Sequence, residues 1–141
     1  MNKTIQNFGY PDTLIREYDH WVVLLRPAQV TLGSLILACK ESAQKFSDIS
    51  SAAFAEQEIV VKDIERVLSS FVRFEKMNYV MLMMVDPDVH YHVLPRYSEP
   101  RTFAATEFVD AGWPALPNLG EPTVTTAEQN TELVAHLKSL W

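Results

Sequence analysis

Short apolar runs bounded by turn residues recur through the first forty residues, and this pattern predicts β-strands. The runs at residues 13–17 and 21–25 are separated by only three residues, so they are predicted to form a hairpin. A third run, at residues 34–39, has lost the alternation of apolar and polar positions and should be a strand buried on both faces. Residues 1–12 are polar and contain Gly and Pro, so we expect an irregular arm or a short helical turn there.

The apolar positions of residues 50–75 recur at helical spacing and predict the long helix of the chain. Two strands are expected to follow, at residues 79–85 and 88–96. The Asp86-Pro87 link between them is so short that these two strands should be antiparallel neighbours. The order of elements, β-β-β-α-β-β, predicts an α+β fold in which a long helix packs on one face of an antiparallel sheet of about five strands.

Residues 98–141 differ in character, because proline, glycine and acidic residues are frequent there. An extended, aromatic tail is predicted first, and a last helix at residues 127–140 follows the N-cap Thr126. With 141 residues and 48% apolar content, the chain fits one domain. Within it we distinguish a core of residues 1–97 from the tail, which should pack along the core or across a partner subunit.

Charge and hydropathy narrow the classes of partner. The net charge of −6 argues against a nucleic-acid groove, which needs a basic face, but it leaves a local mononucleotide pocket possible. No apolar run approaches the roughly 20 residues that span a bilayer. The single Cys39 cannot form an intrachain disulfide, and no secretion signal is recognisable, so a cytoplasmic location is expected. Nothing implies an organic cofactor.

The chemistry of the chain is expected in residues 86–97, Asp-Pro-Asp-Val-His-Tyr-His-Val-Leu-Pro-Arg-Tyr. Side chains alternate between the two faces of a strand, so Asp88, His90 and His92 would share one face, and the apolar residues between them would share the other. Pro95 should end the ladder because it has no N–H to donate. One face of this strand is therefore predicted to carry the catalytic or binding side chains, and the other face is predicted to pack in the core.

This run resembles the signature of the histidine triad family, in which three histidines alternate with apolar residues and a short Pro-Arg ending often follows. Aligned on that ending, His92 and His90 take the third and middle histidine positions, and Asp88 takes the first. The Lys-Met-Asn-Tyr lead-in that begins at residue 76 also matches, as does a Gly-His-apolar segment in which Ser34 replaces the histidine. The resemblance covers about residues 13–97.

The resemblance implies a nucleotide hydrolase or transferase that acts at the α-phosphate of a nucleoside phosphoramidate or dinucleoside polyphosphate. His90 would form a covalent nucleotidyl-histidine, His92 would donate to the phosphate or the leaving group, and the main-chain carbonyl of Asp88 would fix the tautomer of His90. The implied partners are a nucleotide or small phosphorylated ligand and a second copy of the chain, in a homodimer. Substrate contacts are expected from three further residues, Arg26, Ser34 and Arg96.

Other positions depart from the family pattern. Arg26 stands where relatives often carry Asn or Asp to meet ribose hydroxyls, and a guanidinium cannot accept a hydrogen bond. Met84 and Val85 stand where relatives carry polar side chains that hold the phosphate. We expect these two residues to be packing residues of a Met-rich strand rather than a soft-metal site.

Asp88 leaves open whether the chain hydrolyses nucleotides, because a carboxylate would repel a bound phosphate. Protonation of Asp88, or its pairing with Arg96 or Arg101, would avoid that repulsion. Two other functions therefore stay open beside the hydrolase: a non-catalytic nucleotide-binding protein of the same fold, and a divalent-metal site formed by Asp88, His90 and His92.

Overall fold

The computed structural model describes residues 1–141 and contains a five-stranded antiparallel sheet. Its strands follow the spatial order β1-β2-β3-β5-β4, so β4 and β5 are neighbours as predicted. The α+β fold expected from the sequence is confirmed. The strand bounds are β1 Leu14–Glu17, β2 Trp21–Leu25, β3 Leu35–Cys39, β4 Lys76–Val80 and β5 His90–Arg96.

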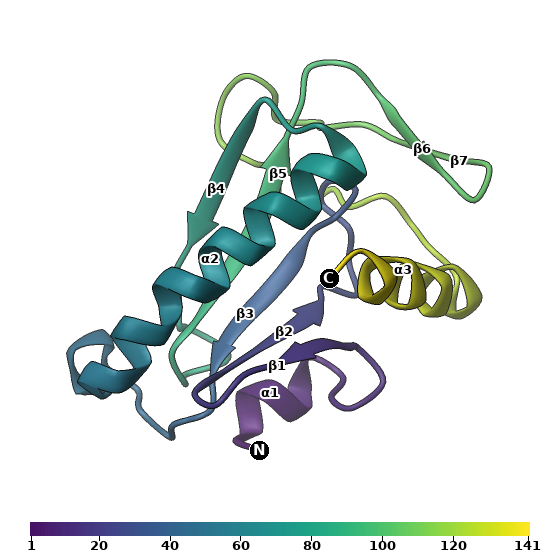
Figure 1. Cartoon of the computed structure of the whole chain (residues 1–141). Helices are drawn as coiled ribbons and strands as arrows, with labels where there is room; N and C mark the ends of the chain where they lie inside the picture. The colour runs from purple at the N-terminus through teal and green to yellow at the C-terminus, as the bar shows by residue number, and fades with distance from the viewer.

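Helices cover both faces of this sheet. The long helix α2 (Ser51–Val72) and the last helix α3 (Ala127–Leu140) lie on one face, which buries the larger apolar core (Figure 1). The short helix α1 (Lys3–Asn7) places Ile5 on the opposite face, against a smaller apolar cluster of β2 and β3 residues. None of the helices is both long and apolar enough to cross a lipid bilayer.

Both long helices begin where their capping residues predict. The side chain of Ser50 accepts a hydrogen bond from Ala53 N at the start of α2, and Thr126 forms a capping box with Gln129 at the start of α3. Helix α2 ends at Val72, earlier than expected, because Arg73 takes a left-handed backbone conformation with φ 48°. A single 3₁₀ turn, Phe46–Asp48, precedes α2.

The strand predicted at residues 79–85 is wrong in its second half. Strand β4 ends at Val80, and residues 81–89 form a loop with Met83 at φ 51°. Met84 and Val85 are not core residues, since they are 83% and 93% exposed, whereas Met81 and Met83 pack against the larger core. The pattern of apolar residues alone cannot show where a strand ends, because the end depends on whether a neighbouring element covers the apolar side chains.

Two further expectations need correction. The ladder does not end before Pro95, because Met77 pairs with Pro95 and Lys76 with Arg96 in the β4–β5 register. The tail is not only extended: it contains a hairpin of β6 (Arg101–Phe103) and β7 (Thr106–Phe108), which extends past the end of α2 in Figure 1. The tail lies on its own body, with Phe108 buried in the larger core.

Candidate active site

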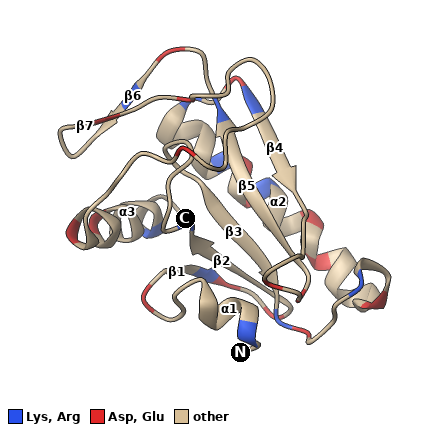
Figure 2. Cartoon of the chain, turned by 180° about the vertical axis from the view of Figure 1, so that it is seen from behind, with Lys and Arg blue, Asp and Glu red and all other residues tan.

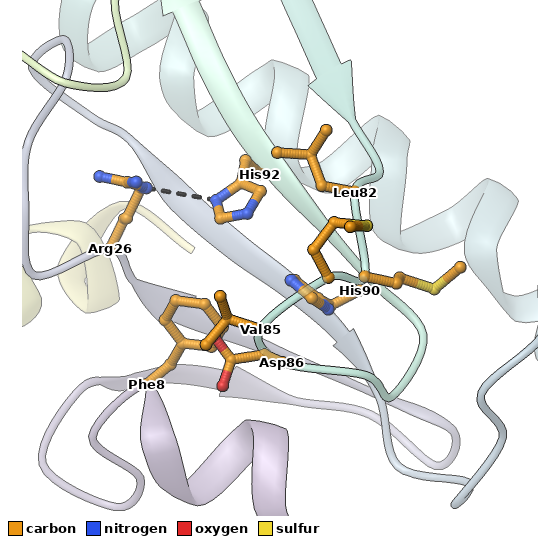
Figure 3. A pocket seen from close by; sticks show the side chains of 9 residues that line it. Phe8, Arg26, Leu82, Val85, Asp86, His90 and His92 are labelled. Carbon is orange, nitrogen blue, oxygen red and sulfur yellow. Dashed lines mark hydrogen bonds between the residues drawn. The ribbon is translucent and has the colours of Figure 1, made fainter.

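The two histidines of β5 lie together on the sheet face opposite α2 and α3. His90 pairs with Ala38 and His92 with Ile36, so both side chains are on the face of the smaller apolar cluster. Their ring centroids are 5.3 Å apart. Both rings line a cavity of about 250 Å³, which we call the histidine pocket (Figure 3).

A single hydrogen bond fixes the tautomer of His90. The Nδ1 atom of His90 lies 2.7 Å from the main-chain oxygen of Asp88. A carbonyl oxygen can only accept, so Nδ1 carries the proton and the Nε2 of the neutral ring holds an unshared electron pair. This is the contact expected from the sequence for the first position of the triad, and a main-chain atom makes it whatever side chain stands there.

His92 holds the opposite tautomer, because its neighbour is an arginine. Arg26 Nε donates to His92 Nδ1 at 3.2 Å, as the dashed line in Figure 3 shows. A guanidinium can only donate, so Nδ1 is the acceptor and the proton of the neutral ring is on Nε2. Burial, and then the positive charge of Arg26, lower the pKa of His92 from 6.5 to about 4, so His92 is neutral at pH 7.

Arg26 is itself held in place by its own loop. Its Nη1 donates to the carbonyl oxygen of Ala28 at 2.5 Å, and burial lowers the pKa of the guanidinium below its usual range. The guanidinium lines the histidine pocket, so the pocket has one fixed cation beside the two imidazoles. Arg26 was expected at the substrate from the sequence, and the structure places it beside the histidines.

The walls of the pocket come from two segments, and only the second of them, with Met84 and Val85, was connected with the site by the sequence. Phe8, which follows α1, lies with its ring centroid 5.4 Å from His90 and 5.9 Å from His92. The loop after β4 forms the other wall with five residues, Leu82, Met83, Met84, Val85 and Asp86. No local signal marks a lone phenylalanine in a polar arm as a pocket residue, because its place depends on where α1 packs.

Asp88 does not point into the histidine pocket. Its carboxylate accepts from the hydroxyl of Thr4 at 3.0 Å, and its main-chain N–H donates to that same hydroxyl at 3.1 Å. Of the two alternatives left open by the sequence, the pairing of Asp88 with Arg96 or Arg101 is not found, since both arginines bind other groups. Asp88 serves to hold α1 against the start of β5, and its side chain is not among the residues that line the pocket.

Two residues expected at the substrate lie elsewhere. Ser34 is fully buried, and its hydroxyl donates to the Thr31 carbonyl within a tight turn. Arg96 is 4% exposed at the far end of β5, where it forms a two-point ion pair with Asp110, with N···O distances of 2.6 and 3.1 Å. These positions argue against a direct contact of either residue with a ligand in the histidine pocket.

The geometry also argues against the proposed metal site. The Asp88 carboxylate is bound to Thr4, and the Nδ1 atoms of His90 and His92 are bound to a carbonyl and to Arg26. The three side chains therefore do not converge on one point. No group of three or more His, Cys, Asp or Glu side chains in the chain is placed to hold a metal ion.

Several solved structures that resemble this chain are histidine triad proteins. One from Bradyrhizobium japonicum has a TM-score of 0.75 at 19% identity, covering 100% of this chain and 97% of that chain. One from Sinorhizobium meliloti has a TM-score of 0.76 at 15% identity, covering 100% and 96%. The diadenosine triphosphate hydrolase of Plasmodium falciparum has a TM-score of 0.66 at 10% identity, covering 92% and 76%.

By sequence, no family model and no curated protein matches the chain. The structural likeness nevertheless confirms, for the fold, the resemblance indicated by the alternating histidines.

Proposed function

We propose that this chain, which has the fold of histidine triad proteins, cleaves nucleotides at the α-phosphate through a covalent intermediate on His90. The observation that carries the proposal is the pair of opposite tautomers in one pocket. His90 offers an unshared electron pair on Nε2, and His92 offers an N–H on Nε2. A nucleophile beside a neutral donor is the arrangement that phosphoryl transfer through histidine needs.

In the proposed reaction, His90 Nε2 attacks the α-phosphorus, so a P–N bond forms as the bond to the leaving group breaks. The leaving group departs with the electron pair of that bond and, if it is an amine, takes a proton from solvent. Water then attacks the phosphorus and breaks the P–N bond, which releases a nucleoside monophosphate and one proton and regenerates neutral His90. His92 keeps its proton throughout and stabilises the phosphate oxygens or the leaving group as a hydrogen-bond donor.

Arg26 supplies positive charge for the phosphate in this proposal. One N–H of its guanidinium is used by His92 and one by the Ala28 carbonyl, which leaves three of the five for a ligand. Met84 and Val85 have no side-chain donor, so Arg26 and His92 supply the side-chain donors of the pocket. A charge-assisted contact from Arg26 would replace the neutral donors that the loop lacks.

The size of the pocket limits how a substrate can bind. A volume of about 250 Å³ is below the range of about 300 to 1,000 Å³ that encloses a typical small-molecule ligand. The pocket therefore encloses the reacting phosphate and its neighbouring atoms, and the rest of the ligand extends over the exposed apolar loop at Met84 and Val85. A nucleoside phosphoramidate or a dinucleoside polyphosphate fits this description.

A second candidate function is nucleotide binding without turnover. It is favoured by Asp86, whose carboxylate lines the same pocket as the histidines and would oppose the charge that builds up on a reacting phosphate. Asp86 accepts from Asn7 Nδ2 at 2.9 Å, and this hydrogen bond delocalises its charge but does not remove it.

Intact-mass spectrometry distinguishes the two functions. The purified chain is incubated briefly with adenosine phosphoramidate and quenched under conditions that spare the acid-labile P–N bond. We expect a mass increase of one AMP in the wild type and in His20→Gln, which changes a histidine outside the pocket, and no increase in His90→Ala. An adduct that survives His90→Ala would exclude His90 as the nucleophile, whereas AMP binding without any adduct or turnover would establish the binding function.

A further inference from the structure

A second and larger cavity lies on the same face of the sheet, at the other end of β4 and β5. Its volume is about 430 Å³, and we call it the Trp113 pocket after the tryptophan in its wall. From the face opposite α2, Figure 2 shows the segment between β7 and α3 crossing the ends of these two strands. Residues 113–117 of that segment form one wall, and the strands contribute Lys76, Asn78 and Arg96.

The side chains of this pocket present hydrogen-bond donors without internal partners. Lys76 belongs to none of the ion pairs of the chain. The Oδ1 atom of Asn78 accepts from Arg96 Nη1 at 2.8 Å. Because a guanidinium cannot accept, this contact fixes the orientation of the amide and leaves Asn78 Nδ2 as a donor. The indole N–H of Trp113 likewise forms no hydrogen bond within the chain and is not buried.

No carboxylate competes for these donors. Asp110, the partner of Arg96, is 7% exposed and receives two hydrogen bonds from it, so its charge is compensated there. None of the eight residues that line the pocket is acidic. Lys76 is therefore the uncompensated charge of the pocket, although the chain as a whole carries a net charge of −6.

The rest of the lining is apolar and flat. Trp113 and Pro114 stand beside Leu116, which is 86% exposed, and Pro117. An indole face next to prolines suits a planar ring or another rigid apolar group. The volume falls within the range of pockets that enclose small molecules.

From these observations we infer that the Trp113 pocket binds a small organic anion. Its phosphate or carboxylate group binds Lys76 Nζ and Asn78 Nδ2, and its planar apolar body packs on Trp113. His92 and Arg96 are four positions apart on β5, which is about 13 Å of extended strand, so this site is distinct from the histidine pocket. The inference does not depend on the proposed hydrolase function.

Calorimetric titration with three probes that share one ring system tests the ligand class: 1-naphthyl phosphate, 1-naphthoate and the neutral 1-naphthalenemethanol. We expect both anions to bind at one site and the alcohol to bind at least about tenfold more weakly, because it lacks the charge that Lys76 recognises. Equal binding of all three probes would overturn the assignment of an anion site. Binding of the phosphate alone would restrict the site to phosphate esters.

Variants then place the bound probe. Lys76→Gln should weaken both anions about fivefold without changing the alcohol, and Trp113→Leu should weaken all three. Lys138→Gln removes an equally exposed lysine from α3 and should change nothing. His90→Ala should also leave binding unchanged. If it abolishes binding while Lys76→Gln does not, the probe occupies the histidine pocket and the inference fails, whatever the outcome of the adenosine phosphoramidate experiment.

Discussion

At the scale of single residues, the site depends on which nitrogen of each histidine carries the proton. A main-chain carbonyl sets this for His90 and a guanidinium sets it for His92. Arg26 therefore does two things: it holds His92 in the neutral, donor-out form, and it brings positive charge to the pocket. A lysine at residue 26 could supply the charge but not the same Nε contact.

Substitution of Arg26 tests this role directly. Arg26→Met removes a neighbouring positive charge, so the pKa of His92 should rise from about 4 toward its ordinary value of 6.5, although burial continues to lower it. Nitrogen-resolved NMR titration of the imidazoles measures this, with His20 as an internal reference. A pKa of His92 that stays near 4 in Arg26→Met would show that burial alone accounts for the shift.

The same lowered pKa makes stability depend on pH with a definite sign. Between pH values of about 4 and 6.5, unfolded His92 binds a proton that the folded form excludes. The free energy of unfolding therefore falls as the pH drops through this window, and the contribution of His92 is constant above it. Urea unfolding at several pH values should show a shallower fall in His92→Gln than in the wild type.

At the scale of elements, the short helix α1 brings the N-terminal arm to the histidine pocket. Three polar contacts hold it against the loop before β5 and the end of β3: Thr4 to Asp88, Asn7 to Asp86, and Asn2 Nδ2 to the Cys39 carbonyl at 2.9 Å. The residue that departs from the family's first histidine thus has a structural use here. It anchors the helix that carries Phe8 to the wall of the pocket.

Removing this anchor should loosen the pocket wall. In Thr4→Val the buried Asp88 carboxylate loses its hydroxyl donor, which should destabilise the fold by about 1 to 3 kcal/mol and speed amide exchange in residues 3–8. Asp88→His, the change toward the family pattern, removes the same hydrogen bond from the other side and should not raise turnover. Hydrogen exchange with mass spectrometry measures the first effect, and Thr131→Val on the exposed face of α3 is the matched control. Unchanged exchange in residues 3–8 would contradict the anchoring role.

The elements that the sequence predicted well are those fixed by local chemistry. The serine and threonine caps and the helical apolar stripes gave α2 and α3, and the turn at residues 18–20 gave the first hairpin. The loop of residues 81–89 and the pocket wall at Phe8 could not be predicted, because their positions follow from contacts between segments distant in the chain. The Asp88–Thr4 pair, 84 residues apart, is one such contact.

At the scale of the whole molecule, the homodimer stays a prediction. Strand β4 is an edge strand that pairs only with β5, and α2 exposes the apolar side chains of Phe54 and Ile59, at 41% and 59%. An open edge and exposed apolar groups each favour self-association.

Light scattering on the eluting peak of a sizing column tests the association. We expect twice the chain mass of 16.1 kDa, and a shift toward the monomer in Ile59→Glu. Val124→Glu places the same charge at an 89% exposed valine before α3 and should leave the mass unchanged. A wild type that elutes as a monomer at all concentrations would refute the dimer.

The buried pair between Arg96 and Asp110 also limits how short a chain can keep this fold. The Pro-Arg ending lies at the close of the sheet, but the carboxylate that neutralises the arginine comes from beyond the hairpin of β6 and β7. A chain cut after residue 97 would leave a buried cation without its anion, at a cost of about 3 to 5 kcal/mol, and would also lose Phe108 and the α3 side chains from the core. The sheet therefore needs its tail in order to fold, and the chemistry of the histidines depends on residues that are not in contact with them.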